Sequence, residues 1–120
     1  MKGQLLIIEG KRADKPLFAE NLKAKGFFVS VVSSGADALL LLNDNYYDLI
    51  IINTVSIGSS GIRISTSIRE KFHQFIPIVL IVDDPAKAAI SKADLYLVLP
   101  LTVQKIINRI SIYLPGDEAS

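Results

Sequence analysis

The sequence predicts a single α/β domain built around a parallel β-sheet that is buried on both faces. The chain has 120 residues, which is the length of one ordinary domain. Half of its residues are hydrophobic and the mean hydropathy is +0.40. The apolar residues nevertheless come in short runs, well below the roughly 20 residues that a membrane-spanning helix needs. Because these runs lack polar alternation and are separated by segments of helical spacing, they indicate strands covered by helices on both sides.

The first part of the chain shows a strand, a helix and a second strand. Residues 5–8 are a continuous apolar run with β-branched content, which is typical of a buried strand. Asp14 as an N-cap and Pro16 in the first turn predict the start of a helix, and Gly26 is a natural stop for it. Residues 27–32, FFVSVV, are predicted to form the second strand.

The next helix and strand follow at once. Ser34 with Asp37 three residues later resembles a capping box, so a helix is expected from this point to residues 43–45. Residues 49–52 then form the third strand, and the absence of polar alternation predicts a central position in the sheet. Residues 55–61, VSIGSSG, are expected to be a loop.

The second half repeats the strand–helix alternation. One helix is predicted from an apolar stripe at a spacing of four residues, formed by Ile64, Ile68 and Phe72. Three basic residues of this helix are expected to face water: Arg63, Arg69 and Lys71. A fourth strand covers residues 78–82, and the segment before the fifth strand, residues 95–98, holds only one short helix over residues 85–91. Five strands alternating with five helices imply right-handed crossovers.

The last helix is capped by Thr102 and ended by Pro115-Gly116. Its apolar stripe consists of Val103, Ile106, Ile107, Ile110 and Leu114. Because this stripe is broad, we expect that part of it stays outside the core and allows a homodimer. The domain is predicted to cover residues 1–115, and residues 116–120 to be a tail or the start of a linker to a further domain.

Composition excludes several classes of function. The chain has no cysteine, so there is no disulfide framework and no thiolate metal site. The net charge is +1, which leaves no electrostatic footprint for nucleic acid. The N-terminus does not have the pattern of a signal peptide, so a cytoplasmic domain without membrane contact is expected.

Five segments carry a resemblance to a known family. In order along the chain they read LLIIEG, YDLIIIN, GSSG, IPIVLIV and KADLYLVLPL. This series resembles the receiver domain of bacterial response regulators, and it covers essentially the whole chain. The resemblance implies a flavodoxin-like, doubly wound five-stranded sheet of order 2-1-3-4-5 with five helices. It also implies a shortened fourth helix, since the segment between the last two strands is shorter than is usual in the family.

The resemblance further implies which residues would carry phosphoryl chemistry, and here the sequence departs from the pattern. Asn53 stands at the phosphoacceptor aspartate, and Glu9 and Gly10 stand at the acidic pair that helps to hold Mg²⁺. Val82 replaces the hydroxyl residue and Leu99 replaces the lysine that contact the phosphoryl group. An amide is no nucleophile for phosphoryl transfer, and one carboxylate is a poor site for a hard dication. The expected domain is a degenerate receiver that is not an enzyme and has no catalytic residue, metal or cofactor.

The family's usual signalling surface predicts where partners bind. It lies on the fourth helix, the fifth strand and the fifth helix, which makes Tyr96, Leu99, Leu101, Ile106 and Tyr113 the candidate interaction residues. The expected partner is a protein, an adjacent output domain or a second copy of the chain.

Two other functions stay open. One is a small-ligand-binding flavodoxin-like domain that uses the carboxyl edge of the sheet. The other is a residual cation or phosphotransfer site in which Asp83 and Asp84 act with Glu9, although the same two aspartates suit a helix cap. A deep pocket beside Asn53 would favour a ligand, whereas a filled edge would favour an interaction domain.

Overall fold

Five parallel strands form the centre of the fold, in the order β2-β1-β3-β4-β5. The computed structural model describes residues 3–10, 15–57, 60–72, 76–90 and 92–115. The strands are β1 Gln4–Ile8, β2 Phe28–Val32, β3 Leu49–Asn53, β4 Ile78–Val82 and β5 Leu95–Val98. This order and the doubly wound flavodoxin-like architecture confirm the predicted fold class.

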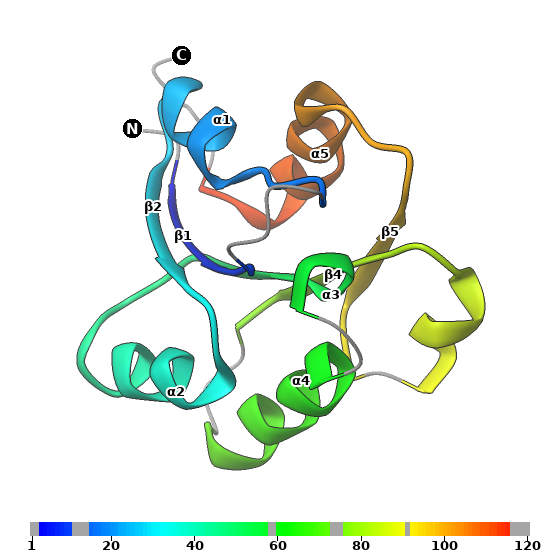
Figure 1. The fold of residues 1–120 in the computed structure, drawn as a ribbon. Helices are drawn as coiled ribbons and strands as arrows, with labels where there is room; N and C mark the ends of the chain where they lie inside the picture. The colour runs from blue at the N-terminus through cyan, green and yellow to red at the C-terminus, as the bar shows by residue number, and fades with distance from the viewer. Residues whose placement is uncertain (1–2, 11–14, 58–59, 73–75, 91, 116–120) are drawn as a thin grey trace.

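Helices cover both faces of the sheet, with α1 and α5 on one side and α2 and α4 on the other (Figure 1). The helical elements are α1 Ala19–Ala24, α2 Gly35–Asp44, α3 Thr54–Ile57, α4 Ser60–Lys71, the 3₁₀ helix η1 Pro85–Ile90, α5 Val103–Ile110 and the 3₁₀ turn η2 Ser111–Tyr113. The short η1 stands where a shortened fourth helix was predicted. In the described part of the chain, no helix has the length and apolar character required to cross a lipid bilayer.

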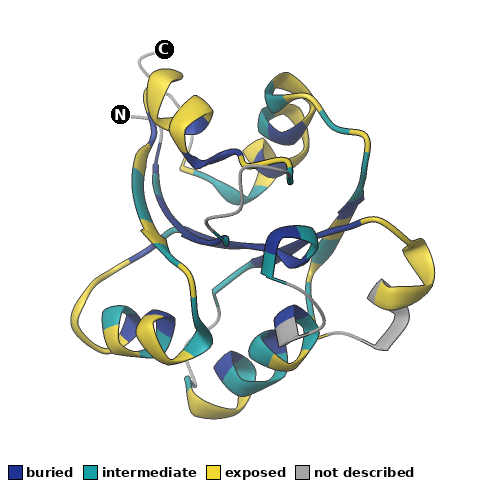
Figure 2. Cartoon of the chain, in the orientation of Figure 1, coloured by how far each residue is buried: buried dark blue, intermediate teal, exposed yellow. Residues whose placement is uncertain are grey.

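The two cores follow from strand alternation, since neighbouring side chains of a strand point to opposite faces of the sheet. Leu5 and Ile7 of β1 pack with α1 and α5, whereas Leu6 and Ile8 pack with α2 and α4. Every residue of β3 and β4 is buried, as expected for central strands between two helical layers (Figure 2).

Two predicted N-caps are confirmed by their hydrogen bonds. The Ser34 hydroxyl accepts the backbone N–H of Asp37 at 3.1 Å and begins α2. The Thr102 hydroxyl accepts the backbone N–H of Lys105 at 3.1 Å and begins α5. Both cap residues have extended backbone conformations, which is the local geometry that lets the side chain turn back onto the first helical turn.

Two helix boundaries differ from the prediction. Helix α1 begins at Ala19 rather than near Pro16, and its N-cap residue Phe18 makes no side-chain cap bond. Asp14, the expected cap, lies outside the described residues. The segment predicted as a loop is also partly helical, because α3 forms one turn directly after β3 and α4 already begins at Ser60.

Arg69 does not face water as predicted. Its guanidinium donates to the backbone carbonyl of Ile76 at 2.7 Å and forms an ion pair with Asp94. The Asp94 carboxylate also accepts the backbone N–H of Ile78 at 2.8 Å. The long aliphatic stem of arginine allows its charged end to reach past its own helix. Arg69 therefore ties α4 to the segments that enter β4 and β5.

The apolar stripe of α5 faces one of the two cores and is partly buried there. Ile106 and Ile110 are completely buried, and Val103, Ile107 and Leu114 pack against the same core. The expectation that Ile106 belongs to an interaction surface is therefore wrong. The physical reason is that α5 packs on the face of the sheet that carries Leu5, Ile7, Leu49 and Ile51, which buries Ile106.

Candidate functional site

The carboxyl ends of β1 and β3 bring the predicted site residues together. The two strands are neighbours, with Ile8 opposite Ile52, so Glu9 and Asn53 follow at the same edge. Glu9 is 4% exposed and Asn53 is completely buried. The sheet therefore places these two residues at the position that the sequence predicts, but beneath the surface.

The Glu9 carboxylate is held by three hydrogen-bond donors. It accepts the backbone N–H groups of Phe18 at 2.7 Å and Ala19 at 3.2 Å, and the side-chain amide of Asn53 at 3.2 Å. The first two donors belong to the chain entering α1, so Glu9 takes over the capping function there. This explains why α1 begins only at Ala19. Sequence reasoning assigned Glu9 to a lost metal site and missed this role, because the capping residue comes from another element.

The Asn53 side chain is oriented by two acceptors. Its amide nitrogen donates to Glu9 and, at 2.8 Å, to the backbone carbonyl of Pro16. Its amide oxygen is buried and has no hydrogen-bond partner among the described residues. An aspartate at this position would replace a donor by an acceptor and face the Glu9 carboxylate, so the amide is required by its surroundings.

Gly10 has no room for a side chain. A Cβ atom at this position would lie 2.2 Å from the backbone oxygen of Ser56 and 3.0 Å from its carbonyl carbon. The α3 turn is fixed there, since the Gly10 N–H donates to the Ser56 hydroxyl and that hydroxyl donates to the Asn53 carbonyl, both at 2.9 Å. The backbone of α3 therefore fills the space that a second acid would need.

The remaining positions of the expected site are apolar. Val82 is buried at the end of β4, and Leu99 is half-buried, with its N–H bonded to the Val82 carbonyl. A shallow hollow of about 410 Å³ lies beside them, lined by Pro16, Asp83, Leu99, Pro100 and Leu101. Asn53 does not line this hollow. Asn53 itself is completely buried.

Asp83 and Asp84 do not join Glu9. Asp83 forms an exposed ion pair with Lys87 at 2.8 Å, and Asp84 accepts the backbone N–H of Ala86 at 3.0 Å. In the described part of the chain, no three acidic or histidine side chains converge as metal ligands would. These aspartates cap and pair within η1, which is the simpler of the two interpretations that the sequence left open.

Comparison with known proteins places this geometry in context. No protein-family model matches the chain. It is 25% identical over 120 residues to the phosphate regulon transcriptional regulatory protein PhoB of Rhizobium meliloti, covering 95% of this chain and 53% of PhoB. It is 27% identical over 121 residues to the transcriptional regulatory protein HprR of Escherichia coli, covering 97% of this chain and 53% of HprR. The chain spans about half the length of the curated relatives it matches.

Solved structures show the same fold. The receiver domain of the response regulator TorR superposes with a TM-score of 0.70 at 21% identity, covering 91% of this chain and 93% of that one. The response regulator TrrA of Thermotoga maritima, solved in complex with Mg²⁺-BeF, superposes with a TM-score of 0.75 at 23% identity, covering 95% and 100% of the two chains. The chain has the CheY-like, flavodoxin-like fold of these receiver domains. Its sheet order and helix positions agree with this assignment along its described length.

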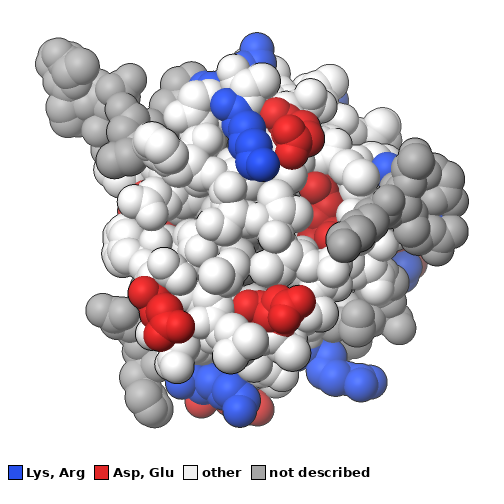
Figure 3. Space-filling view, turned by 60° about the vertical axis from the view of Figure 1, so that its left-hand side comes forward, with Lys and Arg blue, Asp and Glu red and all other residues white. Residues whose placement is uncertain are grey.

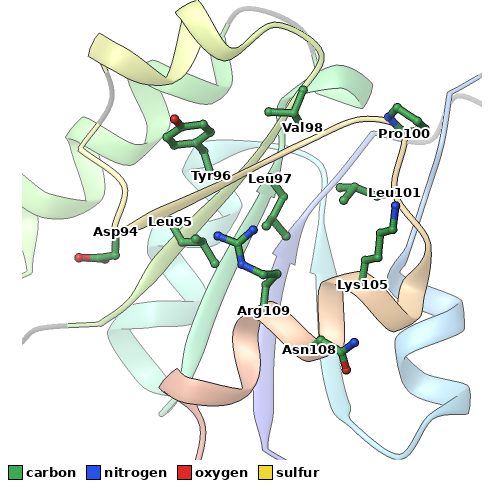
Figure 4. Close-up of a pocket in the computed structure, with 10 residues that line it drawn as sticks. All are labelled: Asp94, Leu95, Tyr96, Leu97, Val98, Pro100, Leu101, Lys105, Asn108 and Arg109. Carbon is green, nitrogen blue, oxygen red and sulfur yellow. The ribbon is translucent and has the colours of Figure 1, made fainter.

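A second feature of the domain is a groove between β5 and α5, with a volume of about 690 Å³. Tyr96 of β5 and Leu101, two of the predicted interaction residues, line it, and Tyr96 is 49% exposed. Lys105 and Arg109 reach from α5 toward the strand (Figure 4). Sequence reasoning missed these two cations, although their spacing of four residues on the outer face of the last helix was visible.

Two other predicted interaction residues lie outside this groove. Leu99 lines the neighbouring hollow at the sheet edge. Tyr113 is half-buried, packs against the core and donates its hydroxyl to the Asp94 carbonyl at 3.4 Å.

The ion pair between Asp83 and Lys87 predicts a change in the pKa of Asp83 that can be measured. The hydrogen bond from Lys87 holds the pKa of Asp83 below its ordinary value of 3.8. Because the pKa is lowered on folding, any contribution to stability is present above that value and is lost as the pH falls through the lowered pKa. We expect Lys87→Met to raise the Asp83 pKa toward 3.8, measured by carbon-detected NMR of the side-chain carboxyl.

The matched control for this titration is Lys23→Met, which removes a lysine that pairs with Glu20 instead. This control is expected to leave the Asp83 midpoint unchanged. An unchanged midpoint in Lys87→Met would contradict the assignment of the ion pair.

Proposed function

We propose that this domain is a receiver-type signalling domain that works without aspartyl phosphorylation, through contacts with proteins. The observation that carries the proposal is the position of the Ser56 carbonyl, 2.2 Å from where a Cβ atom on Gly10 would lie. Gly10 stands at the second position of the expected acidic pair, and this contact leaves no space there for an acidic side chain. The degenerate site is thus filled by the fold's own backbone.

The chemistry of the remaining residues supports the same proposal. Acceptance of a phosphoryl group needs a carboxylate nucleophile and a divalent cation held by several oxygen ligands. Asn53 supplies an amide, and the Glu9 oxygens already accept hydrogen bonds from three donors. The residues present therefore do not fit Mg²⁺.

The proposed activity is binding rather than catalysis. The groove between β5 and α5 offers an apolar floor from Leu95 and Leu97 and a basic rim from Lys105 and Arg109. A protein partner or an adjacent output domain is the occupant that we propose. Asn53 is completely buried, so among the described residues of this edge the shallow hollow at Leu99 is the place where a small ligand would bind.

The proposal is tested by an amide NMR titration with Mg²⁺ and beryllofluoride, the probe bound in the TrrA structure. We expect no saturable shifts at Glu9, Asn53, Val82 or Tyr96. Saturable shifts clustered at Glu9, Asp83 and Asp84 would overturn the proposal, because they would show a rebuilt phosphoryl site.

Asn53→Asp is expected to destabilise the domain without restoring phosphorylation. The new carboxylate would lie next to Glu9, with no lysine at position 99 to offset the repulsion. Two such charges about 4 Å apart repel by roughly 4 kcal/mol at an effective dielectric constant of 20. Urea unfolding measures the loss, and intact-mass spectrometry after incubation with acetyl phosphate tests for a phosphoryl adduct.

The matched control is Asn43→Asp, an exposed asparagine on α2, for which little change in stability is expected. A phosphoryl adduct on Asn53→Asp would show that the rest of the site is functional, contrary to the proposal.

A further inference from the structure

Strand β2 forms an edge of the sheet that lacks the usual protection against pairing. It contacts only β1 within the sheet, and its sequence FVSVV contains no charged residue and no proline. Phe28 is 60% exposed and Val31 is 42% exposed. Figure 2 shows exposed and intermediate residues along β2 beside the buried β1. Edge strands normally carry lysine, proline or a bulge, because an open apolar edge pairs with other strands.

The backbone groups that point outward can be assigned from the hydrogen bonds to β1. The Phe28 N–H donates to Gly3, and the Val32 carbonyl accepts from Glu9. Since alternate residues of a strand bond to opposite sides, Ser30 also faces β1, and Val29 and Val31 face away. Each copy of the chain therefore presents two N–H groups and two carbonyls along this edge.

We propose that β2 pairs with β2 of a second copy, in antiparallel orientation about a two-fold axis at Ser30. Val29 of one copy then stands opposite Val31 of the other, and both such pairs exchange two hydrogen bonds. All the outward groups of Val29 and Val31 are satisfied by this register. The two sheets join into one continuous sheet, independently of the phosphoryl site discussed above.

The side chains fit the same register. Phe28 stands opposite Val32 of the second copy in a pair without hydrogen bonds, where the Cα atoms approach to about 4.5 Å. Its exposed ring thereby gains an apolar neighbour. A two-fold interface brings identical strands together, so a strand with a net charge would repel its copy. Strand β2 contains no charged residue, so this repulsion does not arise. Figure 3 brings this side of the molecule forward and shows an uncharged area between scattered charged groups.

A second copy of the chain is the proposed partner, because the free edge of β2 is complementary to itself in both hydrogen bonding and charge. One strand pair is a small interface compared with those of obligate dimers. We therefore expect a weak, reversible dimer, with a dissociation constant of roughly 0.1 to 1 mM.

Hydrogen exchange by NMR tests the register directly on the unmodified chain. The amides of Val29 and Val31 should exchange fast in dilute protein and slow down as the concentration rises, about tenfold when nine-tenths is dimeric. The amides of Ser30 and Val32 bond to β1 and should be protected at every concentration. If the Val29 and Val31 amides exchange equally fast up to about 1 mM protein, the proposal is overturned.

Two matched substitutions identify the edge that pairs. Val31→Lys places a charge on β2 and should abolish dimerisation in sedimentation equilibrium. Ile112→Lys places the same charge on an apolar residue of η2 that is 78% exposed and distant in sequence from β2, and it should leave the dimer intact. Val31→Pro removes the outward N–H without adding a charge, and it should also abolish dimerisation. A dimer that survives Val31→Lys, or that is lost in Ile112→Lys instead, overturns the proposal.

Discussion

Gly10→Ala is expected to destabilise the domain by about 3 kcal/mol. The added Cβ would lie 2.2 Å from the Ser56 oxygen, which is a backbone atom and cannot rotate away. The α3 turn would have to shift, which breaks the hydrogen bonds that join Gly10, Ser56 and Asn53. Urea unfolding followed by circular dichroism measures the change in the free energy of unfolding.

Gly35→Ala is the control for this effect. A Cβ at Gly35 would lie 2.9 Å from Cγ1 of the Ile64 side chain, which can change its rotamer. Gly35 is also the first residue of α2, where alanine is at least as favourable as glycine. A change below about 1 kcal/mol is expected. Equal losses in the two variants would show that the contact of Gly10 with α3 is not the cause.

Glu9→Gln is expected to cost a similar amount, about 3 kcal/mol, although it preserves the size of the side chain. The carboxylate accepts from Phe18, Ala19 and Asn53, whereas a carboxamide has a single oxygen for these donors and adds a donor of its own. At least one buried donor is left without a partner. The expected result is a lower midpoint of urea unfolding, together with faster hydrogen exchange at Phe18 and Ala19.

Glu20→Gln is the matched control, because Glu20 is 85% exposed and pairs only with Lys23. Its substitution should change stability by less than about 0.5 kcal/mol. If Glu9→Gln behaved like this control, Glu9 would not be the cap of α1.

The same result would bear on the proposed function. A Glu9 that served only as a remnant of a cation site would, without a cation, be a buried charge that weakens the fold, so its neutralisation would stabilise the domain. A loss of stability supports the view that the carboxylate is part of the fold. The sign of the change therefore separates the two roles.

Much of the fold is predictable from short segments of sequence. The apolar runs mark all five strands within a residue or two, and Ser34 and Thr102 mark the starts of two helices. These signals are local, because strand burial and N-capping depend on residues within a few positions. The residue type at position 53 is equally readable, since an amide has no carboxylate whatever its surroundings.

The predictions that failed concern residues whose partners are distant in the chain. Arg69 was expected to face water, but it pairs with Asp94, 25 positions away. Ile106 was expected at a surface, but α5 turns it into the core. The spacing of residues on a helix shows which of them share a face. It does not show whether that face contacts the core, another segment or solvent.

The sequence by itself therefore determined the class of fold, the order of its elements and the residue types at the carboxyl edge of the sheet. Only the tertiary structure decided what those residues contact. Glu9 caps a helix that begins nine positions later, and Gly10 meets the backbone of Ser56, 46 positions away. Such contacts depend on which strands become neighbours in the sheet, and hence on the packing of the whole chain, which no local pattern encodes.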